Sequence, residues 1–459
     1  MKKTILFILV CLFTISNLSA QFTSQQLSSA QAIINEDFVI KGEIYNSSTE
    51  AITSIKYAYE INETSTEKTI TTNVAVNSGA IVEFPVNSIN ESGIYSIKIT
   101  ILEINGKTDL VTSNNSKTTD LVVGALFFDK KVVVEEGTGT WCQYCPRGMV
   151  GMAMMKEKYP ESFIGIAVHV SDVMAVSYYV NAMLKYFANL PSCVVNRKDQ
   201  LHGDPYFDIE KFYLSEMETK AIAGIKLSGS FTSAEKTEID LTTLTTFGFP
   251  ETKASYKLAY VLIENEVTGS GSNYYQINAY AGTTEPMGGY ENKPAVITDQ
   301  VYEEVARAIH APLGLANSVP TSFTELEELN HSQTIKLPSN INNKDNVEVI
   351  VMLLNAKGEV VNADKMKMKD MPTVGIKDIE ETNSMVSNIR KTDNSLSFEL
   401  QSSNSALIHL YDVCGRLIYS QKQQVNGVQT ISIPTSGMKG IFLLKVQSKD
   451  KVVGKKVIL

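Results

Sequence analysis

The sequence predicts a multidomain α+β protein in which one α/β domain is flanked by β-sandwich domains. The chain has 459 residues, which is too long for one ordinary hydrophobic core. Its hydrophobic share of 43% and charged share of 20% are typical of a folded protein. Short alternating runs fill most of the chain, but between residues 126 and 223 strand patterns alternate with helix patterns.

Residues 1–20 have the features of a secretory signal peptide. Two lysines precede the apolar run Ile5–Ile15, and small and polar residues then lead to a cleavage site after Ala20. Cys11 is a candidate for a lipid anchor, but it lies inside the apolar run and not at its end, so we reject that alternative. No later stretch has the roughly 18 apolar residues of a membrane helix, so we expect no transmembrane helix after signal removal.

The regions on either side of the α/β domain have strand patterns. Residues 21–125 contain runs such as Ile55–Tyr59 between turn residues, at the spacing of an Ig-like β-sandwich. This region has no His or Cys and is interpreted as a spacer or binding module. Residues 224–371 are predicted to be β-rich, with one helix at Asp299–His310. The tyrosines of the loop Gly269–Pro294 could bind sugars or peptides, but packing within the domain is the favoured interpretation.

The α/β domain, residues 126–223, is predicted from a strand followed by a helix, repeated three times. Its strands are buried apolar runs, and its helices have one apolar face. The predicted strands are Val132–Val134, Phe163–Val170 and Ser192–Asn196, and the predicted helices are Met149–Tyr159, Ser177–Asn189 and Phe207–Lys220.

Cys142 and Cys145 are the candidate catalytic residues and the expected disulfide. They form a CxxC motif that follows a strand, comes directly after Trp141 and opens a helix. Two intervening residues let the thiols close a ring, and a helix N-terminus favours a thiolate. A zinc site would need further ligands from Cys193, His169 and His202, with no second CxxC, so no metal and no cofactor are predicted. Cys193 is expected to be a buried, unreactive thiol.

These features resemble the thioredoxin fold, and the resemblance implies further site residues. Leu190 and Pro191 would form a cis-proline loop that presents backbone to a substrate, with Pro191 counted among the catalytic residues together with Trp141. Glu136 would be a buried acid that assists proton transfer, although a partly exposed charge at the strand end is an equal alternative.

Three other residues have weaker functional interpretations. Tyr144 lies within the dithiol motif and could contact substrate. His169 could tune the thiolate, but a hydrogen-bonded structural histidine is the favoured interpretation. Arg147 could add positive potential near the thiols or be solvated.

The middle of the chain resembles the outer-membrane-protein-28-related family. The matching residues include Glu135–Glu136, Cys142–Gly148, Ile166–His169 and Val195–Arg197. The resemblance spans roughly Lys131 to Met371 and implies a thioredoxin-like fold, but it does not indicate a substrate.

Residues 382–459, after a linker at 372–381, resemble the C-terminal sorting domain of type IX secretion substrates. The resembling residues include Leu410–Asp412, Gly415–Leu417, Gly440–Val446 and Lys455–Val457, and Cys414 is interpreted as a small turn residue. The resemblance implies a β-sandwich, a type IX secretion partner and passage across a Gram-negative outer membrane, often with later removal of this domain.

Two functions remain open from the sequence. The first is an exported thioredoxin-like thiol–disulfide oxidoreductase that acts on cysteines of extracytoplasmic proteins through Cys142-Gln143-Tyr144-Cys145. The alternative is a non-catalytic cell-surface binding or structural protein with an inert Cys142–Cys145 disulfide. Either would be secreted through the periplasm or held at the cell surface, and the net charge of −9 argues against a nucleic-acid partner.

Overall fold

The computed structural model describes residues 20–22, 27, 30–109, 111–187, 189–373, 385–392, 394–412, 416–449 and 451–458. Most of the predicted signal peptide, Cys11, Cys414 and most of the predicted linker lie outside the described residues. The chain divides into two compact units. One comprises Met1–Gly229 with Ile239–Met371, and the other comprises Ser230–Glu238 with Pro372–Leu459.

The N-terminal part of the first unit consists of two β-sheets. One sheet has the order β1-β3-β6, and the other has the order β2-β9-β7-β4-β5 with β8 paired to β7. Alternate residues of these strands point inward and enclose one apolar core that includes Ile44, Tyr57, Phe84 and Ile99. The strands are β1 Ala20–Phe22, β2 Ala30–Ile33, β3 Phe38–Asn46, β4 Ile52–Ile61, β5 Thr64–Val74, β6 Ser78–Val86, β7 Gly93–Ile104, β8 Lys107–Thr108 and β9 Ser116–Gly124.

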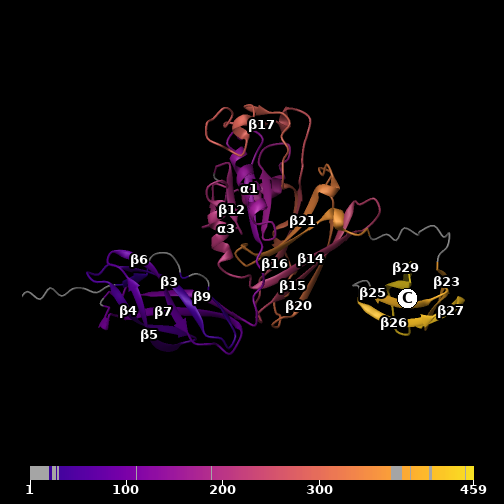
Figure 1. Ribbon diagram of the computed structural model, residues 1–459, viewed down its shortest axis with the longest axis horizontal. Helices are drawn as coiled ribbons and strands as arrows, with labels where there is room; N and C mark the ends of the chain where they lie inside the picture. The colour runs from indigo at the N-terminus through magenta and orange to yellow at the C-terminus, as the bar shows by residue number, and fades with distance from the viewer. Residues whose placement is uncertain are drawn as a thin grey trace, which may run out of the picture. The chain divides into compact units, whose positions relative to one another are not determined.

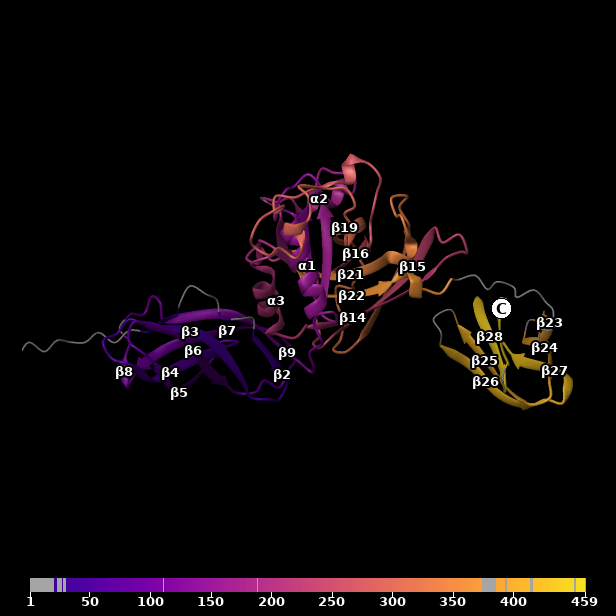
Figure 2. The ribbon, with the colours of Figure 1, turned by 45° about the horizontal axis from the view of Figure 1, so that its top comes forward.

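The central part of this unit is built on an eight-stranded mixed sheet with the order β13-β12-β10-β11-β19-β16-β21-β22. Figure 1 labels β12, β16 and β21 of this sheet. β10 is parallel to β11, and β11 is parallel to β19, while the other neighbours are antiparallel. Figure 2 shows β16, β19, β21 and β22 side by side. The strands are β10 Val132–Thr138, β11 Phe163–His169, β12 Ser192–Val195, β13 His202–Gly203, β16 Lys257–Glu264, β19 Val305–Leu315, β21 Val347–Leu354 and β22 Val360–Lys367.

Three α-helices among the described residues cover this sheet: α1 Pro146–Lys158, α2 Ser177–Met183 and α3 Ile209–Met217. α1 and α3 pack with Val132 and Val134 on one face. α2 packs with Val133 on the other face. Successive residues of β10 therefore point alternately toward α1 and toward α2, since side chains alternate along a strand.

The predicted fold class is wrong, because the structure holds no separate thioredoxin-like α/β domain. Of the described residues, 52% are in strands and 10% in helices, so this part of the chain is mostly β-sheet. β10, β11 and β12 do form. However, β11 pairs with β19, and through β19 the sheet includes further strands of the region 224–371, so one sheet crosses the expected boundary at residue 223. The predicted helix Asp299–His310 is also wrong, since its second half belongs to β19. Local periodicity identified the strands, but strand pairing depends on contacts far apart in sequence.

Two smaller sheets and four 3₁₀ helices complete the first unit. The sheets have the orders β14-β15-β20 and β17-β18. Their strands are β14 Ala223–Phe231, β15 Glu238–Phe247, β17 Gln276–Ile277, β18 Val296–Ile297 and β20 Glu328–Lys336, and the 3₁₀ helices are η1 Ser272–Tyr274, η2 Tyr290–Asn292, η3 Lys344–Asn346 and η4 Met368–Asp370. Within the described parts of the chain, no helix combines the length and apolar character needed to cross a membrane.

The second unit contains two sheets with the orders β23-β24-β27 and β26-β25-β28-β29. Their inward side chains, which include Phe398, Ile408, Leu410 and Leu444, form one core. The strands are β23 Val386–Lys391, β24 Ser395–Ser402, β25 Ser405–Asp412, β26 Leu417–Gln424, β27 Gly427–Pro434, β28 Ile441–Ser448 and β29 Lys451–Ile458.

Candidate functional site

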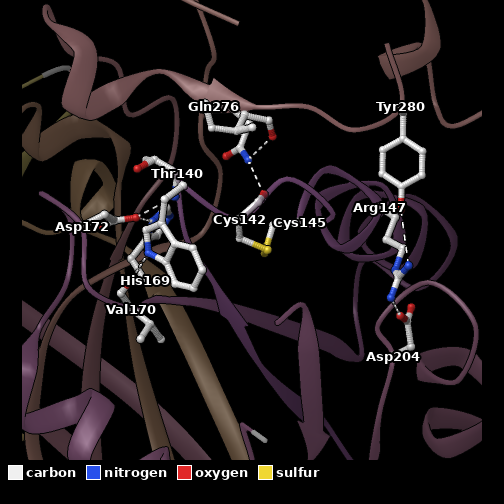
Figure 3. Close-up of a disulfide and its surroundings, with 12 residues drawn as sticks. Thr140, Cys142, Cys145, Arg147, His169, Val170, Asp172, Asp204, Gln276 and Tyr280 are labelled. Atoms are coloured by element: carbon white, nitrogen blue, oxygen red, sulfur yellow. Dashed lines mark hydrogen bonds and ion pairs between the residues drawn. A yellow bond between two sulfur atoms is a disulfide. The ribbon is translucent and has the colours of Figure 1, made fainter. Parts of the chain in front are cut away.

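The candidate site lies in the loop between β10 and α1, where Cys142 and Cys145 form a disulfide (Figure 3). Pro146 occupies the first turn of α1, where a missing N–H costs nothing. Cys145 therefore stands at the helix N-terminus, as the sequence predicted. Both cysteines are buried, with exposed fractions of 5% for Cys142 and 0% for Cys145.

A distant segment of the chain covers the disulfide loop. The Gln276 side chain donates from Nε2 to the carbonyl oxygen of Cys142 at 2.9 Å, as Figure 3 shows. The backbone N–H of Ile277 donates to the carbonyl of Thr140, and the N–H of Ala279 donates to the carbonyl of Gln143, both at 2.9 Å. Three carbonyl groups of the loop are thus already bonded within the protein.

Two aromatic side chains of the loop are exposed. Trp141 is 52% exposed, and its indole Nε1 donates to the carbonyl of Val170 at 2.8 Å. Tyr144 is 47% exposed and meets the Tyr280 ring edge-on, with 6.3 Å between ring centroids. Trp141, a predicted catalytic residue, and Tyr144, a predicted substrate contact, are therefore accessible, whereas the disulfide beside them is buried.

Arg147 does not interact with the disulfide through any contact in the described structure. Its guanidinium forms an ion pair with Asp204 and a 3.5 Å hydrogen bond to the Tyr280 hydroxyl (Figure 3). The same group lies 5.9 Å from the ring centroids of Tyr144 and Phe207. Its visible role is to hold the first turn of α1 against the neighbouring loops.

The Leu190–Pro191 peptide is cis, as the resemblance implied. The Leu190 side chain is half-buried and packs at the edge of the core shared with α2, while the predicted contact of its backbone with a substrate stays a prediction. A Cβ placed on Gly148 of α1 would lie 3.1 Å from the Cβ of Pro191, which brings the proline loop to the first turn of α1.

Glu136 is fully buried below this turn, with an exposed fraction of 1%. The same Cβ on Gly148 would collide with the Glu136 Oε1 atom, so any side chain there would displace the Glu136 carboxyl. Oε1 has no hydrogen-bond partner among the described residues. Burial raises the pKa of Glu136 well above its usual range, and the nearby carboxyls Glu304 and Asp204 raise it further. The alternative of a partly exposed charge is therefore wrong.

Glu135, the neighbour of Glu136, points to the opposite face and is paired. Arg197 donates from Nε and Nη2 to the two Glu135 oxygens at 2.8 and 2.6 Å. The Tyr179 hydroxyl donates to Glu135 Oε1 at 2.6 Å, and Arg197 Nη1 donates to the carbonyl of Pro312 at 2.6 Å. This buried network ties β10 to α2 and is structural.

His169 is buried and held in place at the end of β11. Its Nδ1 lies 2.6 Å from Asp172 Oδ2, and the same oxygen accepts the Thr140 N–H at 2.9 Å. The ring also meets Tyr302 edge-on, with 5.4 Å between centroids. His169 has the hydrogen-bonded structural position that the sequence favoured, and it braces the residue before Trp141.

Cys193 is a free thiol with no exposed surface. It pairs with Glu136 in the β10–β12 register, and burial raises the pKa of its thiol, with the charge of Glu136 adding to the effect. The predicted burial is confirmed. No group of three or more metal-binding His, Cys, Asp or Glu side chains occurs among the residues that the structure describes.

The sequence did not predict that Gln276 bonds to the disulfide loop. It also did not predict the contacts that Tyr280 and Asp172 make with the loop. Gln276 comes 134 residues after Cys142, and nothing local to either residue signals their contact. The tyrosine-rich loop was the available signal, because Tyr280 packs against Tyr144. The anchoring role of Asp172 was also missed.

The fold and site define a β-rich protein with one disulfide among its described residues. Comparison with protein families supports that class. Residues 181–371 match the family described as outer membrane protein Omp28, and residues 392–459 match the secretion system C-terminal sorting domain. The protein is therefore secreted or held at the cell surface or outer membrane, and its sorting domain implies the type IX secretion machinery as a partner.

Comparison with solved structures gives distant similarities. HBP35 of Porphyromonas gingivalis is 15% identical, with a TM-score of 0.39, and the match covers 72% of this chain and 99% of that one. Protein AGR_C_4864 from Agrobacterium tumefaciens is 15% identical, with a TM-score of 0.33, over 54% and 98% of the two chains. The CARDB domain of PF1109 from Pyrococcus furiosus is 21% identical, with a TM-score of 0.19, over 24% and 96%. No curated protein matches the sequence.

Proposed function

We propose that this chain is a non-catalytic binding or structural protein of the cell surface, in which the Cys142–Cys145 disulfide is an inert structural link. The observation that carries this proposal is the burial of both cysteines in a loop whose carbonyl groups are held by hydrogen bonds from Gln276, Ile277 and Ala279. Thiol–disulfide exchange needs a thiolate to reach one of the two sulfurs. Here the cysteines are only 5% and 0% exposed, so an approaching thiol has little access to either sulfur.

The proposal is tested by the reactivity of the folded protein. The native disulfide should resist millimolar reduced glutathione, and the protein should not catalyse insulin reduction above the rate of a Cys142→Ser Cys145→Ser double variant. Gln276→Ala removes one bond of the cover and should speed reduction several-fold. Asn273→Ala, which changes an amide in the same region that forms no bond to the disulfide loop, is the matched control. Catalysis by the wild type that disappears in Cys142→Ser would refute the proposal.

A second candidate function is a thiol–disulfide oxidoreductase that acts on extracytoplasmic proteins. It is supported by the position of Cys145 at the start of α1 and by the buried, unpartnered Glu136 beside cis-Pro191. In this proposal the reduced Cys142 thiolate attacks a substrate disulfide, and Cys145 then resolves the mixed disulfide. The substrate leaves as a dithiol while Cys142–Cys145 becomes oxidised. Glu136 would take up the proton that Cys145 loses.

The two candidates differ in what a trapping variant captures. If Cys142 is the attacking thiol, Cys145→Ser should accumulate a mixed disulfide with protein partners, and Cys142→Ser should accumulate none. If the disulfide is inert, neither variant should trap a partner while the protein remains folded.

A further inference from the structure

A pocket of about 320 Å³ lies along α1, on the side of the sheet that carries Glu136. It is bounded by α1, by β10 and β11, and by the segment from Gly288 to Glu304. The helix residues that line it run from Met149 to Glu157, a rise of about 12 Å at 1.5 Å per residue. Neither cysteine of the disulfide lines this pocket, so it is a separate feature of the fold.

Two residues that line the pocket, Glu136 and Thr138, each carry a buried polar atom without a partner among the described residues. Glu136 and Thr138 are two residues apart on β10, so both point to the same face. Each is 1% exposed, and neither Glu136 Oε1 nor Thr138 Oγ1 has a hydrogen-bond partner among the described residues. Buried polar atoms are nearly always hydrogen-bonded in native proteins, so this pair indicates a site for a donor.

The walls and the mouth of the pocket differ in character. Met149 and Met152 of α1 contribute apolar surface to its wall. The mouth carries Glu157 and Glu303, both exposed. The only cation among its lining residues is Lys156, whose Nζ lies 3.7 Å from Glu303 and 3.6 Å from Glu304.

Carboxyl side chains therefore outnumber Lys and Arg side chains among the residues that line the pocket. The lining includes one lysine, Lys156, and four glutamates: Glu136, Glu157, Glu303 and Glu304. Carboxyls at the floor and mouth and an apolar wall complement a cation on an aliphatic stem, because a nearby cation favours the ionised form of Glu136, whose pKa burial raises. An ammonium group has three donors and no acceptor, which suits a floor whose free atoms can accept.

We propose that this pocket binds a primary alkylammonium group, with its nitrogen donating to Glu136 and Thr138 and its methylene stem packed against Met149 and Met152. The group could belong to a free aliphatic amine or to a lysine side chain of a partner protein. The two sources share this chemistry and are separated by experiment. The inference goes beyond the proposed function, because the pocket is separate from the disulfide and ammonium binding does not depend on whether the disulfide reacts.

Binding is tested on the full-length, oxidised protein by isothermal titration calorimetry. The probes are pentylamine, 1-pentanol as its neutral counterpart, and Nα-acetyl-lysinamide as the lysine side chain. Pentylamine or the lysine probe should bind at least tenfold more tightly than pentanol. Binding of pentylamine but not of the lysine probe would identify a free amine as the source, and the reverse would identify a protein lysine.

Variants of the floor separate this site from general attraction to an acidic protein. Glu136→Gln should weaken ammonium binding at least tenfold, and Thr138→Val should weaken it about threefold, both in proteins whose thermal unfolding shows that they remain folded. Glu63→Gln, which removes a carboxylate that does not line the pocket, is the matched control and should leave binding unchanged.

The inference is wrong if pentanol binds as tightly as pentylamine, if neither ammonium probe binds at 10 mM, or if Glu136→Gln and Thr138→Val both bind like the wild type. None of these outcomes would bear on the reactivity of the disulfide, which is measured separately.

Discussion

Replacing Arg197 by leucine should destabilise the central sheet strongly. Arg197 is 5% exposed and supplies two of the three hydrogen bonds that satisfy Glu135, which is 1% exposed. Without the guanidinium, Glu135 would be a buried charge with only Tyr179 as a partner. Breaking a buried ion pair in this way costs about 3–5 kcal/mol. For a region of this size each kcal/mol lowers the midpoint by roughly 2–4 °C, so we expect a fall of roughly 6–20 °C.

The assay is urea or thermal unfolding followed by tryptophan fluorescence. Trp141 is the single tryptophan of the sequence and lies beside β10, so the signal reports on the central sheet. The matched control is the double variant Glu135→Leu Arg197→Leu, which removes both charges and should recover much of the lost stability, because no unpaired ion remains. A loss below 1 kcal/mol in Arg197→Leu, or a double variant no more stable than the single one, would refute this reasoning.

Four further predictions concern the disulfide, the helix packing, pH and export. Reduction of Cys142–Cys145 should lower stability by only about 2 kcal/mol, because the loop that it closes is very short, and circular dichroism should show that the reduced protein stays folded. Gly151→Ala should cost about 1–3 kcal/mol in urea unfolding, since the new Cβ would overlap the backbone carbonyl of Pro205, which cannot rotate away. Glu136 has a raised pKa, so the folded state keeps the Glu136 proton to higher pH than the unfolded chain does. Protonated Glu136 therefore adds to the free energy of unfolding fully below about pH 4.3, and this contribution is lost as pH rises through the folded pKa. Glu136→Gln should therefore reduce the fall in stability above that pH, and identical pH profiles for the two proteins would contradict this. A chain that ends at residue 381 should fold yet accumulate in the periplasm, and its detection at the cell surface by protease accessibility would contradict the role of the sorting domain.

Local sequence signals predicted several parts of the site correctly. The apolar run at Val132 predicted a buried strand, and β10 begins there. The spacing of Cys142 and Cys145 predicted their disulfide and the start of α1. The cis bond before Pro191 was implied by the resemblance to the thioredoxin fold and not by a local signal, and it is present. The strand and the disulfide depend on residues a few positions apart, whose geometry is set by the backbone around them.

The sequence by itself determined export, a buried strand at Val132, a CxxC disulfide at a helix start and a C-terminal sorting domain. Only the tertiary structure decided that β11 joins β19 instead of closing a separate α/β domain, and that Gln276 covers the disulfide loop. The tertiary structure also decided the different surroundings of the adjacent residues Glu135 and Glu136. Glu135 faces α2 and Arg197, while Glu136 faces α1 and a pocket. The physical reason is that periodicity shows which residues share a face, whereas the partner of that face is chosen by packing between segments far apart in the chain.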